Sequence, residues 1–201
     1  MIKFLTICFI SLFVLQNCAA QKKILLLNGK ERTAATFSLV GENALYKTTD
    51  STKAKKVDMY RVFSVIDTVT GIEQIIYNPD TTEGDLTIEE MREFVEGEQF
   101  AIRTYKSKGN NIASAAVGFS SGILAIYGVV LPPVYSLISG RFDPKIPYDH
   151  PQAPLHINNE YFKYGYQYKA RKMKTQKSLM LGGIGFAVGV TTFAVIFSNL
   201  K

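Results

Sequence analysis

The sequence predicts an α+β protein, in which a small antiparallel β module is followed by a two-helix transmembrane hairpin with amphipathic flanking helices. Turn signals separate short strand-like runs in the first part of the chain. Helical periodicity replaces them near residue 86. Residues 109–140 and 178–200 contain no charged residue. Because about 20 apolar residues suffice to cross a bilayer as a helix, both stretches are long enough to span.

Residues 1–20 predict a secretory signal peptide, since a basic residue is followed by an apolar run and then by small residues. Cleavage after Ala20 is favoured. The alternative is a lipoprotein signal with an acylated Cys18, but Asn17 stands where a small residue is wanted. The remaining cysteine, Cys8, also lies in this region. The mature chain is therefore expected to form no internal disulfide.

Residues 21–85 predict the β module, with five strands in a compact meander or small barrel. Turn signals stand at residues 28–29, 41–43 and 70–71. The first of them is Asn-Gly between strand-like runs, which is a strong hairpin signal. The polar segment 48–58 predicts a solvated loop.

Residues 86–108 predict an amphipathic helix that begins with a capping box of Thr87 and Glu90. An apolar stripe at helical spacing indicates packing on a neighbouring element. Acidic side chains cluster on the same helix and are interpreted as a solvated face. They are Glu89, Glu90, Glu93, Glu96 and Glu98.

Residues 109–140 are expected to form the first transmembrane segment, and residues 178–200 the second. Pro132 and Pro133 are expected to end or kink the first helix, which places its span at 111–131. Between them, residues 141–177 predict a proline-rich loop followed by a basic helix.

Glycines at small-xxx-small spacing are the predicted helix-packing residues of both segments, because they let helix backbones approach closely. Packing within the chain is favoured over a seam between subunits of an oligomer. These residues are Gly118, Gly122, Gly182, Gly183, Gly185 and Gly189.

Basic residues gather just before the second apolar segment and are candidates for contact with lipid headgroups. Positive-inside anchoring explains them most simply, recognition of anionic lipid is the alternative, and nucleic-acid binding is not needed. They include Lys169, Arg171, Lys172, Lys174 and Lys177. The charge bias predicts a cytoplasmic 141–177 loop and a bacterial inner-membrane protein with its N-terminal module in the periplasm.

Two stretches of the chain are interpreted as an internal repeat. The alternative is chance similarity of two helix-to-membrane junctions, but the shared Gly, Gln and Arg positions are more than membrane flanks require. Residues 94–106 match residues 162–174 in Phe/Phe, Gly/Gly, Gln/Gln, Arg/Arg and Lys/Lys positions at an offset of 68. A glycine pair in each apolar segment follows at an offset of 67. With two spans, the two copies are expected to face opposite sides of the membrane.

No catalytic constellation is visible, so the chain is expected not to be an enzyme and to need no cofactor. His150 and His156 are the two histidines of the chain, and their spacing fits no common metal-ligand pattern. Both are interpreted as solvated loop residues.

The segments "RVFSVID", "TIEEMREFVEGEQFA" and "GYQYKARKMKTQKSLMLGGIGFAVG" resemble uncharacterised cell-envelope proteins of Bacteroidota. The resemblance covers most of the mature chain and implies an envelope location, without an activity. We therefore expect a membrane-anchored binding or scaffolding protein, with the lipid bilayer, possible anionic lipid and an envelope protein or second copy as partners. The alternative is a small glycine-packed homo-oligomer that acts as a pore or transport accessory.

Overall fold

The computed structural model describes residues 21–199 except residues 50, 52, 81 and 83. The chain divides into two compact units, one ending at Glu89 and the other beginning at Glu90. The first is built of β-strands and the second of helices, so the fold is α+β as predicted. The expected signal peptide lies outside the described residues.

The β unit contains two small antiparallel sheets. Its elements are β1 (Lys22–Leu26), β2 (Glu31–Ala34), β3 (Thr36–Val40), β4 (Asn43–Lys47), β5 (Lys55–Asp58), the 3-10 helix η1 (Met59–Arg61), β6 (Val62–Asp67) and β7 (Glu73–Ile75). One sheet has the order β2-β1-β6-β7 and the other β3-β4-β5. Both sheets contribute side chains to one core of Ile24, Leu26, Ala34, Ala44, Tyr46, Val62 and Val65.

The three turn signals are confirmed as strand connections. Gly29, Gly41 and Gly71 have φ angles of 68, 57 and 71 degrees, which glycine adopts without steric cost. They connect β1 to β2, β3 to β4, and β6 to β7. The predicted loop 48–58 is wrong at its end, where β5 pairs with β4.

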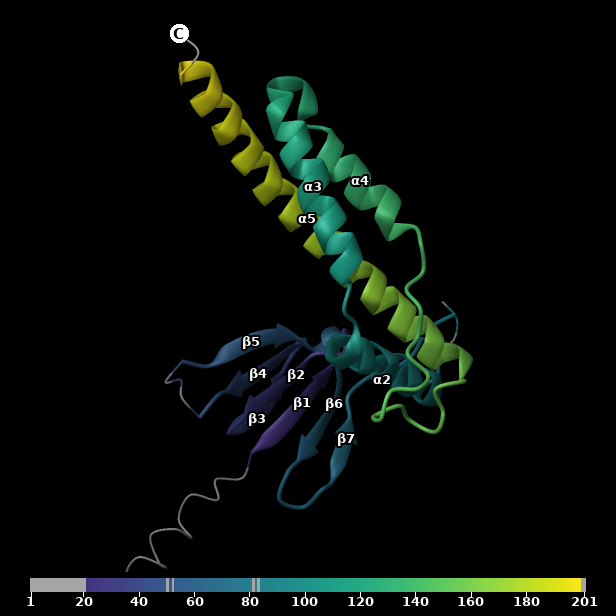
Figure 1. The fold of residues 1–201 in the computed structure, drawn as a ribbon. Helices are drawn as coiled ribbons and strands as arrows, with labels where there is room; N and C mark the ends of the chain where they lie inside the picture. The colour runs from purple at the N-terminus through teal and green to yellow at the C-terminus, as the bar shows by residue number, and fades with distance from the viewer. Residues whose placement is uncertain (1–20, 50, 52, 81, 83, 200–201) are drawn as a thin grey trace, which may run out of the picture. The chain divides into compact units, whose positions relative to one another are not determined.

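The helical unit contains four α-helices in its described residues. They are α2 (Ile88–Thr104), α3 (Lys108–Ile123), α4 (Leu131–Gly140) and α5 (Glu160–Asn199), with the 3-10 helix η2 (Ala125–Gly128) between α3 and α4. At about 1.5 Å per residue, α5 is roughly 60 Å long. Figure 1 shows α3 and α4 beside its C-terminal half.

The first apolar segment turns back on itself. Along α3, Ser114 and then Gly118 meet α5 at Ser178 and Gly182, so the two helices run parallel. On α4, Ser136 instead donates a hydrogen bond to the carbonyl oxygen of Thr175, at 2.9 Å. Since Pro132 at the other end of α4 packs on Gly182, α4 runs antiparallel to both.

The expected single span at 111–131 is therefore replaced by two shorter helices. Pro132 and Pro133 do not end a helix but stand in the first turn of α4. A proline fits there because the first helical N–H groups have no partner within the helix. The chain turns at η2, where Gly128 lies directly against the backbone of Ser121. The structure thus shows no two-helix transmembrane hairpin in the described residues.

One helix of the described residues, α5, is long and apolar enough to cross a bilayer. Its C-terminal half contains the predicted second segment, 178–200, up to the last described residue. Its N-terminal half instead packs on α2 and on the 141–159 loop. Their shared core contains Phe100, Ala101, Ile157, Phe162, Tyr166 and Ala170.

Candidate functional site

The bundle of α3, α4 and the C-terminal half of α5 buries small residues and exposes large apolar ones. Buried there are Ser114, Gly118, Ser121, Gly122, Pro132, Ser136, Ser139, Gly140, Ser178, Gly182, Gly185 and Gly189. Exposed are Ile112, Phe119, Ile123, Leu131, Val134, Leu137, Ile138, Leu179, Met180, Ile184, Val188, Phe193, Val195, Ile196 and Phe197. Water favours the opposite arrangement, whereas lipid favours this one, because helices in lipid associate through close packing of small residues.

Five of the six predicted packing glycines lie in contacts between helices. A Cβ atom on Gly118 would overlap the carbonyl oxygen of Gly182, and one on Gly122 would overlap that of Phe186. The Cβ positions of Gly185 and Gly189 meet carbonyl oxygens of α3 in the same way. Gly183 differs, since apart from its chain neighbours and the adjoining backbone of its own helix no described atom lies within 4 Å of its Cβ position.

The two repeat copies contact each other reciprocally where α2 meets α5. Gly97 lies against the backbone of Phe162, and the equivalent Gly165 lies against the backbone of Phe94. The rings repeat the pattern: Phe94 and Tyr168 have centroids 5.9 Å apart, and the equivalent pair of Phe162 and Phe100 5.8 Å. Exchanging one copy for the other therefore reproduces these glycine and ring contacts.

The same reciprocity continues between α3 and α5. Gly118 packs on Gly182, and at an offset of 67 the equivalent contact is that of Gly185 with Ala115. Gly122 packs on Phe186, and the equivalent contact is that of Gly189 with Phe119. The repeat seen in the sequence thus corresponds to two copies of one packing motif.

A buried ion pair joins α2 to α5 beside this crossing. The ammonium of Lys169, whose residue is 7% exposed, lies 3.9 Å from Oε2 of Glu98, which is 1% exposed. At that separation the pair makes no hydrogen bond. Burial raises the pKa of Glu98 to about 7, and the charges of Lys169 and Lys172 oppose this rise.

The predicted headgroup residues have different environments. Lys169 departs from the expectation, because its ammonium is buried against Glu98 and not presented at the surface. Arg171 pairs with Asp143. The ammonium of Lys174 lies 5.9 Å from the ring centroid of Phe142. Lys172 and Lys177 are exposed.

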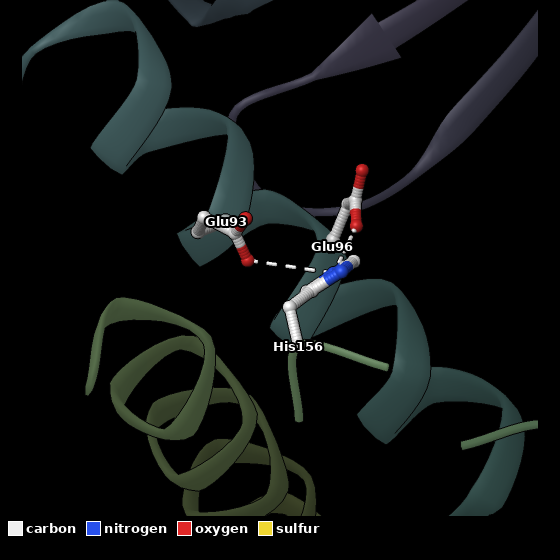
Figure 2. Close-up of side chains that lie close together, drawn as sticks. All are labelled: Glu93, Glu96 and His156. Carbon is white, nitrogen blue, oxygen red and sulfur yellow. Dashed lines mark hydrogen bonds and ion pairs between the residues drawn. The ribbon is translucent and has the colours of Figure 1, made fainter. Parts of the chain in front are cut away.

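A histidine and two carboxylates meet at the surface of α2 (Figure 2). Glu93 and Glu96 stand three residues apart on α2, which places both on one face of the helix. Nε2 of His156 lies 2.7 Å from Oε2 of Glu96 and 3.4 Å from Oε2 of Glu93. Their ligand atoms all lie within 4.8 Å of one another.

The loop before α5 holds His156 in place. The carbonyl oxygen of His156 accepts a hydrogen bond from the N–H of Asn159, at 2.8 Å. Asn159 in turn caps α5 by accepting from the N–H of Tyr161, also at 2.8 Å. Ile157 is buried in the core, and the imidazole ring packs edge-on against Phe162 at 5.6 Å. The position of the ring is therefore fixed by the start of α5.

Sequence reasoning missed this cluster. The sequence indicated that the two acidic residues belong to a solvated face, and His156 follows Glu96 by 60 residues in a segment without periodicity. The one available signal was the repeat itself, because copies that pack on each other bring the start of α5, and the loop before it, to α2.

The β unit contains a cavity of about 200 Å³ beside its core. Its floor includes Ile24, Leu26, Tyr46 and Val57. Four basic side chains also line it: Lys30, Arg32, Lys56 and Arg61. Among the described lining residues none is acidic, so the cavity has the charge to attract an anionic group.

No family model, curated protein or solved structure matches this chain.

Proposed function

We propose that the protein is a membrane-anchored envelope protein, in which the helical bundle is the anchor and the β unit is a binding or scaffolding module without enzymatic activity. The observation that carries the proposal is the distribution of side chains in the bundle. In the most apolar window of α5, only 17% of the residues are buried. An apolar surface of that extent in water would be an aggregation site, whereas in lipid it is the ordinary surface of the protein.

The bundle supports one crossing and one re-entrant hairpin. The C-terminal half of α5 crosses, while α3 and α4 enter and return beside it. Tyr135 on α4 donates a hydrogen bond to Oδ1 of Asn110 on α3, at 3.4 Å, so residues near the start of α3 and on α4 stand at the same level. Serine hydroxyls hydrogen-bonded to backbone carbonyls satisfy polar groups inside such a bundle.

Both repeat copies lie on the same side of the membrane in this proposal, contrary to the opposite sides expected from two spans. The reason is that Phe100 of α2 and Phe162 and Tyr166 of α5 share one core. The two sequence signals for orientation then disagree: the N-terminal apolar run favours export, and the basic 141–177 segment favours the cytoplasm. We keep the export signal, because long domains translocate largely regardless of their charge.

Two exposed positions of α5 test the anchor. Ile184→Lys and Val188→Lys place an ammonium on its outward surface, which costs about 2.5–3.5 kcal/mol at the centre of a membrane helix and almost nothing in water. We expect the natural chain to remain in membranes after alkaline extraction and the double variant to be released. Release of the natural chain, or full retention of the double variant, would contradict the proposal.

Single cysteines test the sides. Introduced at Glu42, Lys172 and Ser198, which are all exposed, they are probed with an impermeant thiol reagent in intact cells. We expect labelling at residues 42 and 172 and not at 198, with the unmodified chain as background. Labelling at residue 42 without residue 172 would restore the two-span arrangement.

The basic cavity supports the binding role of the β unit. Its volume is about 200 Å³, and its charge favours an anion. Retention on a heparin matrix offers a test, because the double variant Arg32→Gln/Lys56→Gln should elute at a lower salt concentration than the natural chain. The control is Lys47→Gln, which removes a positive charge outside the cavity. The salt concentration at elution should fall less for each removed charge in Lys47→Gln than in the double variant. An equal shift of the eluting salt concentration per removed charge in the two variants would contradict anion binding in the cavity.

A further inference from the structure

We propose that Glu93, Glu96 and His156 bind a divalent transition-metal ion of the zinc type. The three side chains come from two separate elements, α2 and the loop before α5, and converge on one point (Figure 2). Imidazole nitrogen and carboxylate oxygen are both ordinary zinc ligands. The proposal is independent of the membrane anchor, since it concerns only residues of α2 and of the loop.

The charges at this point favour a divalent cation. Two carboxylates face one imidazole, and a protonated imidazole can balance only one of them. The two carboxylates repel each other, because their oxygen atoms lie within 4.8 Å of one another. A divalent ion balances both carboxylates and leaves the imidazole neutral, which is the form that ligates metals.

The hydrogen bonding leads to the same conclusion. Oε2 of Glu93 is inaccessible to solvent, and among the described residues it has no hydrogen-bond partner. A buried carboxylate oxygen without a hydrogen-bond partner destabilises the fold by the full cost of its desolvation. Nε2 of His156 is 3.4 Å away from it. An ion between these two atoms would satisfy both.

The spacing agrees with metal geometry. Ligand atoms at about 2.1 Å from a tetrahedral zinc lie roughly 3.4 Å from each other. The Glu93–His156 pair is already at that separation, whereas Glu96 is 0.7 Å closer to the imidazole than such a site requires, because 3.4 Å minus 2.7 Å is 0.7 Å. Glu96 is partly exposed and free to turn by that amount. Three protein ligands leave one position of the tetrahedron for water, and the exposed side of His156 gives access to it.

Metal binding at this place would tie the loop to α2. The loop residue His156 precedes the start of α5, and Glu96 adjoins Gly97 at the crossing of the two repeat copies. The ion would therefore fasten the connection between the copies, because it would bond to side chains of both elements.

The test is titration of the purified, tag-free full-length chain in detergent micelles with ZnCl₂, MnCl₂ and CaCl₂, after removal of metal with a chelator. Isothermal titration should give one zinc per chain, bound more tightly than manganese and much more tightly than calcium. Glu93→Gln, Glu96→Gln and His156→Gln should each weaken zinc binding at least about tenfold, equal to about 1.4 kcal/mol. Zinc should also raise the thermal unfolding midpoint of the natural chain and not that of these variants.

Two matched controls separate this site from adventitious binding. His150→Gln removes the other histidine, and Glu89→Gln removes an exposed carboxylate of the same helix, so both should bind zinc as the natural chain does. Circular dichroism of every variant establishes that helix content is retained. Zinc binding that is equal in the natural chain and in His156→Gln, or absent from a folded natural chain, would overturn the proposal.

Discussion

Gly97 and Gly165 occupy equivalent positions of the repeat, and each lies against the backbone of the phenylalanine three residues before the other. A Cβ atom at either position would overlap a carbonyl oxygen, that of Phe162 or that of Phe94. Because backbone cannot rotate away as a flexible side chain can, α2 and α5 would have to separate. The close crossing of these helices depends on both glycines.

Substitution at the two glycines should therefore have matched effects. Gly97→Ala and Gly165→Ala are each expected to destabilise the helical unit by about 1–3 kcal/mol through overpacking. The double variant should cost less than the sum, since the first substitution already separates the helices. Denaturant unfolding of all three chains checks this. Gly109→Ala, at a position where no described atom is near, serves as the control; strict additivity would count against a shared crossing.

The glycines of α5 provide an internal comparison between neighbouring positions. Gly185→Ala places a methyl group against the carbonyl oxygen of Ala115 and should lower the thermal midpoint in micelles. Gly183→Ala meets open space and should be neutral or slightly stabilising, because alanine is the better helix former. Equal losses at both positions would show that helix propensity, and not packing on α3, decides the outcome.

The hydroxyls of Ser114 and Ser178 form a buried hydrogen bond of 2.6 Å between α3 and α5. Ser114→Ala, Ser178→Ala and the double variant form a cycle that isolates this interaction. With the bundle in lipid, as proposed, we expect a coupling energy of about 0.6 kcal/mol, and less than about 1.7 kcal/mol, as for hydrogen bonds between membrane helices. Unfolding in micelles gives the unfolding free energies of the natural chain, the two single variants and the double variant. Ser120→Ala, on the exposed surface of α3, should change nothing, and zero coupling in the cycle would contradict the contact.

Stability should depend on pH through Glu98. Its pKa is raised from 4.5 to about 7 by burial, so between these values the folded chain holds a proton that the unfolded chain has lost. Stability is then highest at the acidic end of this window and falls as the pH rises through it, by at most about 1.4 kcal/mol per unit.

Variants of the pair identify the group responsible. Glu98→Gln should flatten this decline, seen in unfolding free energies measured between pH 4.5 and 8. Lys169→Met should extend the decline to higher pH, because the Lys169 charge lowers the pKa of Glu98. Glu89→Gln, at an exposed carboxylate, should keep the natural slope. An unchanged slope in Glu98→Gln would assign the effect to another group.

The β unit could be predicted well where glycine marked a turn and poorly where side chains gave no pattern. Gly29, Gly41 and Gly71 adopt left-handed angles and separate the strands as expected. The strand Lys55–Asp58 was missed because its side chains are mostly exposed, so no alternation of apolar and polar residues marks it. Its pairing with β4 is a tertiary effect that overrides its composition.

The helical unit shows a different limit. An uncharged stretch has the same composition whether it crosses a membrane once or turns back, so residues 109–140 read as one span. Pro132 and Pro133 were consistent with a helix end, yet proline is equally suited to a helix start. The repeat was visible in the sequence, but repeated residues need not touch. Only the structure shows that Phe94 contacts Gly165 as Phe162 contacts Gly97.

The reciprocal contacts have the form of an isologous interface, the kind that joins two identical subunits about a two-fold axis. Here the two halves, α2–α3 and α5, belong to one polypeptide, and residues 124–159 connect them. Such an arrangement would arise if an ancestral homodimer became fused in a single gene. Its assembly would no longer depend on the concentration of chains, because the connecting segment supplies the second half at a fixed local concentration. The symmetry is incomplete at the Glu98–Lys169 pair, because the equivalent positions of the other copy hold Tyr166 and Ala101 and cannot form an ion pair.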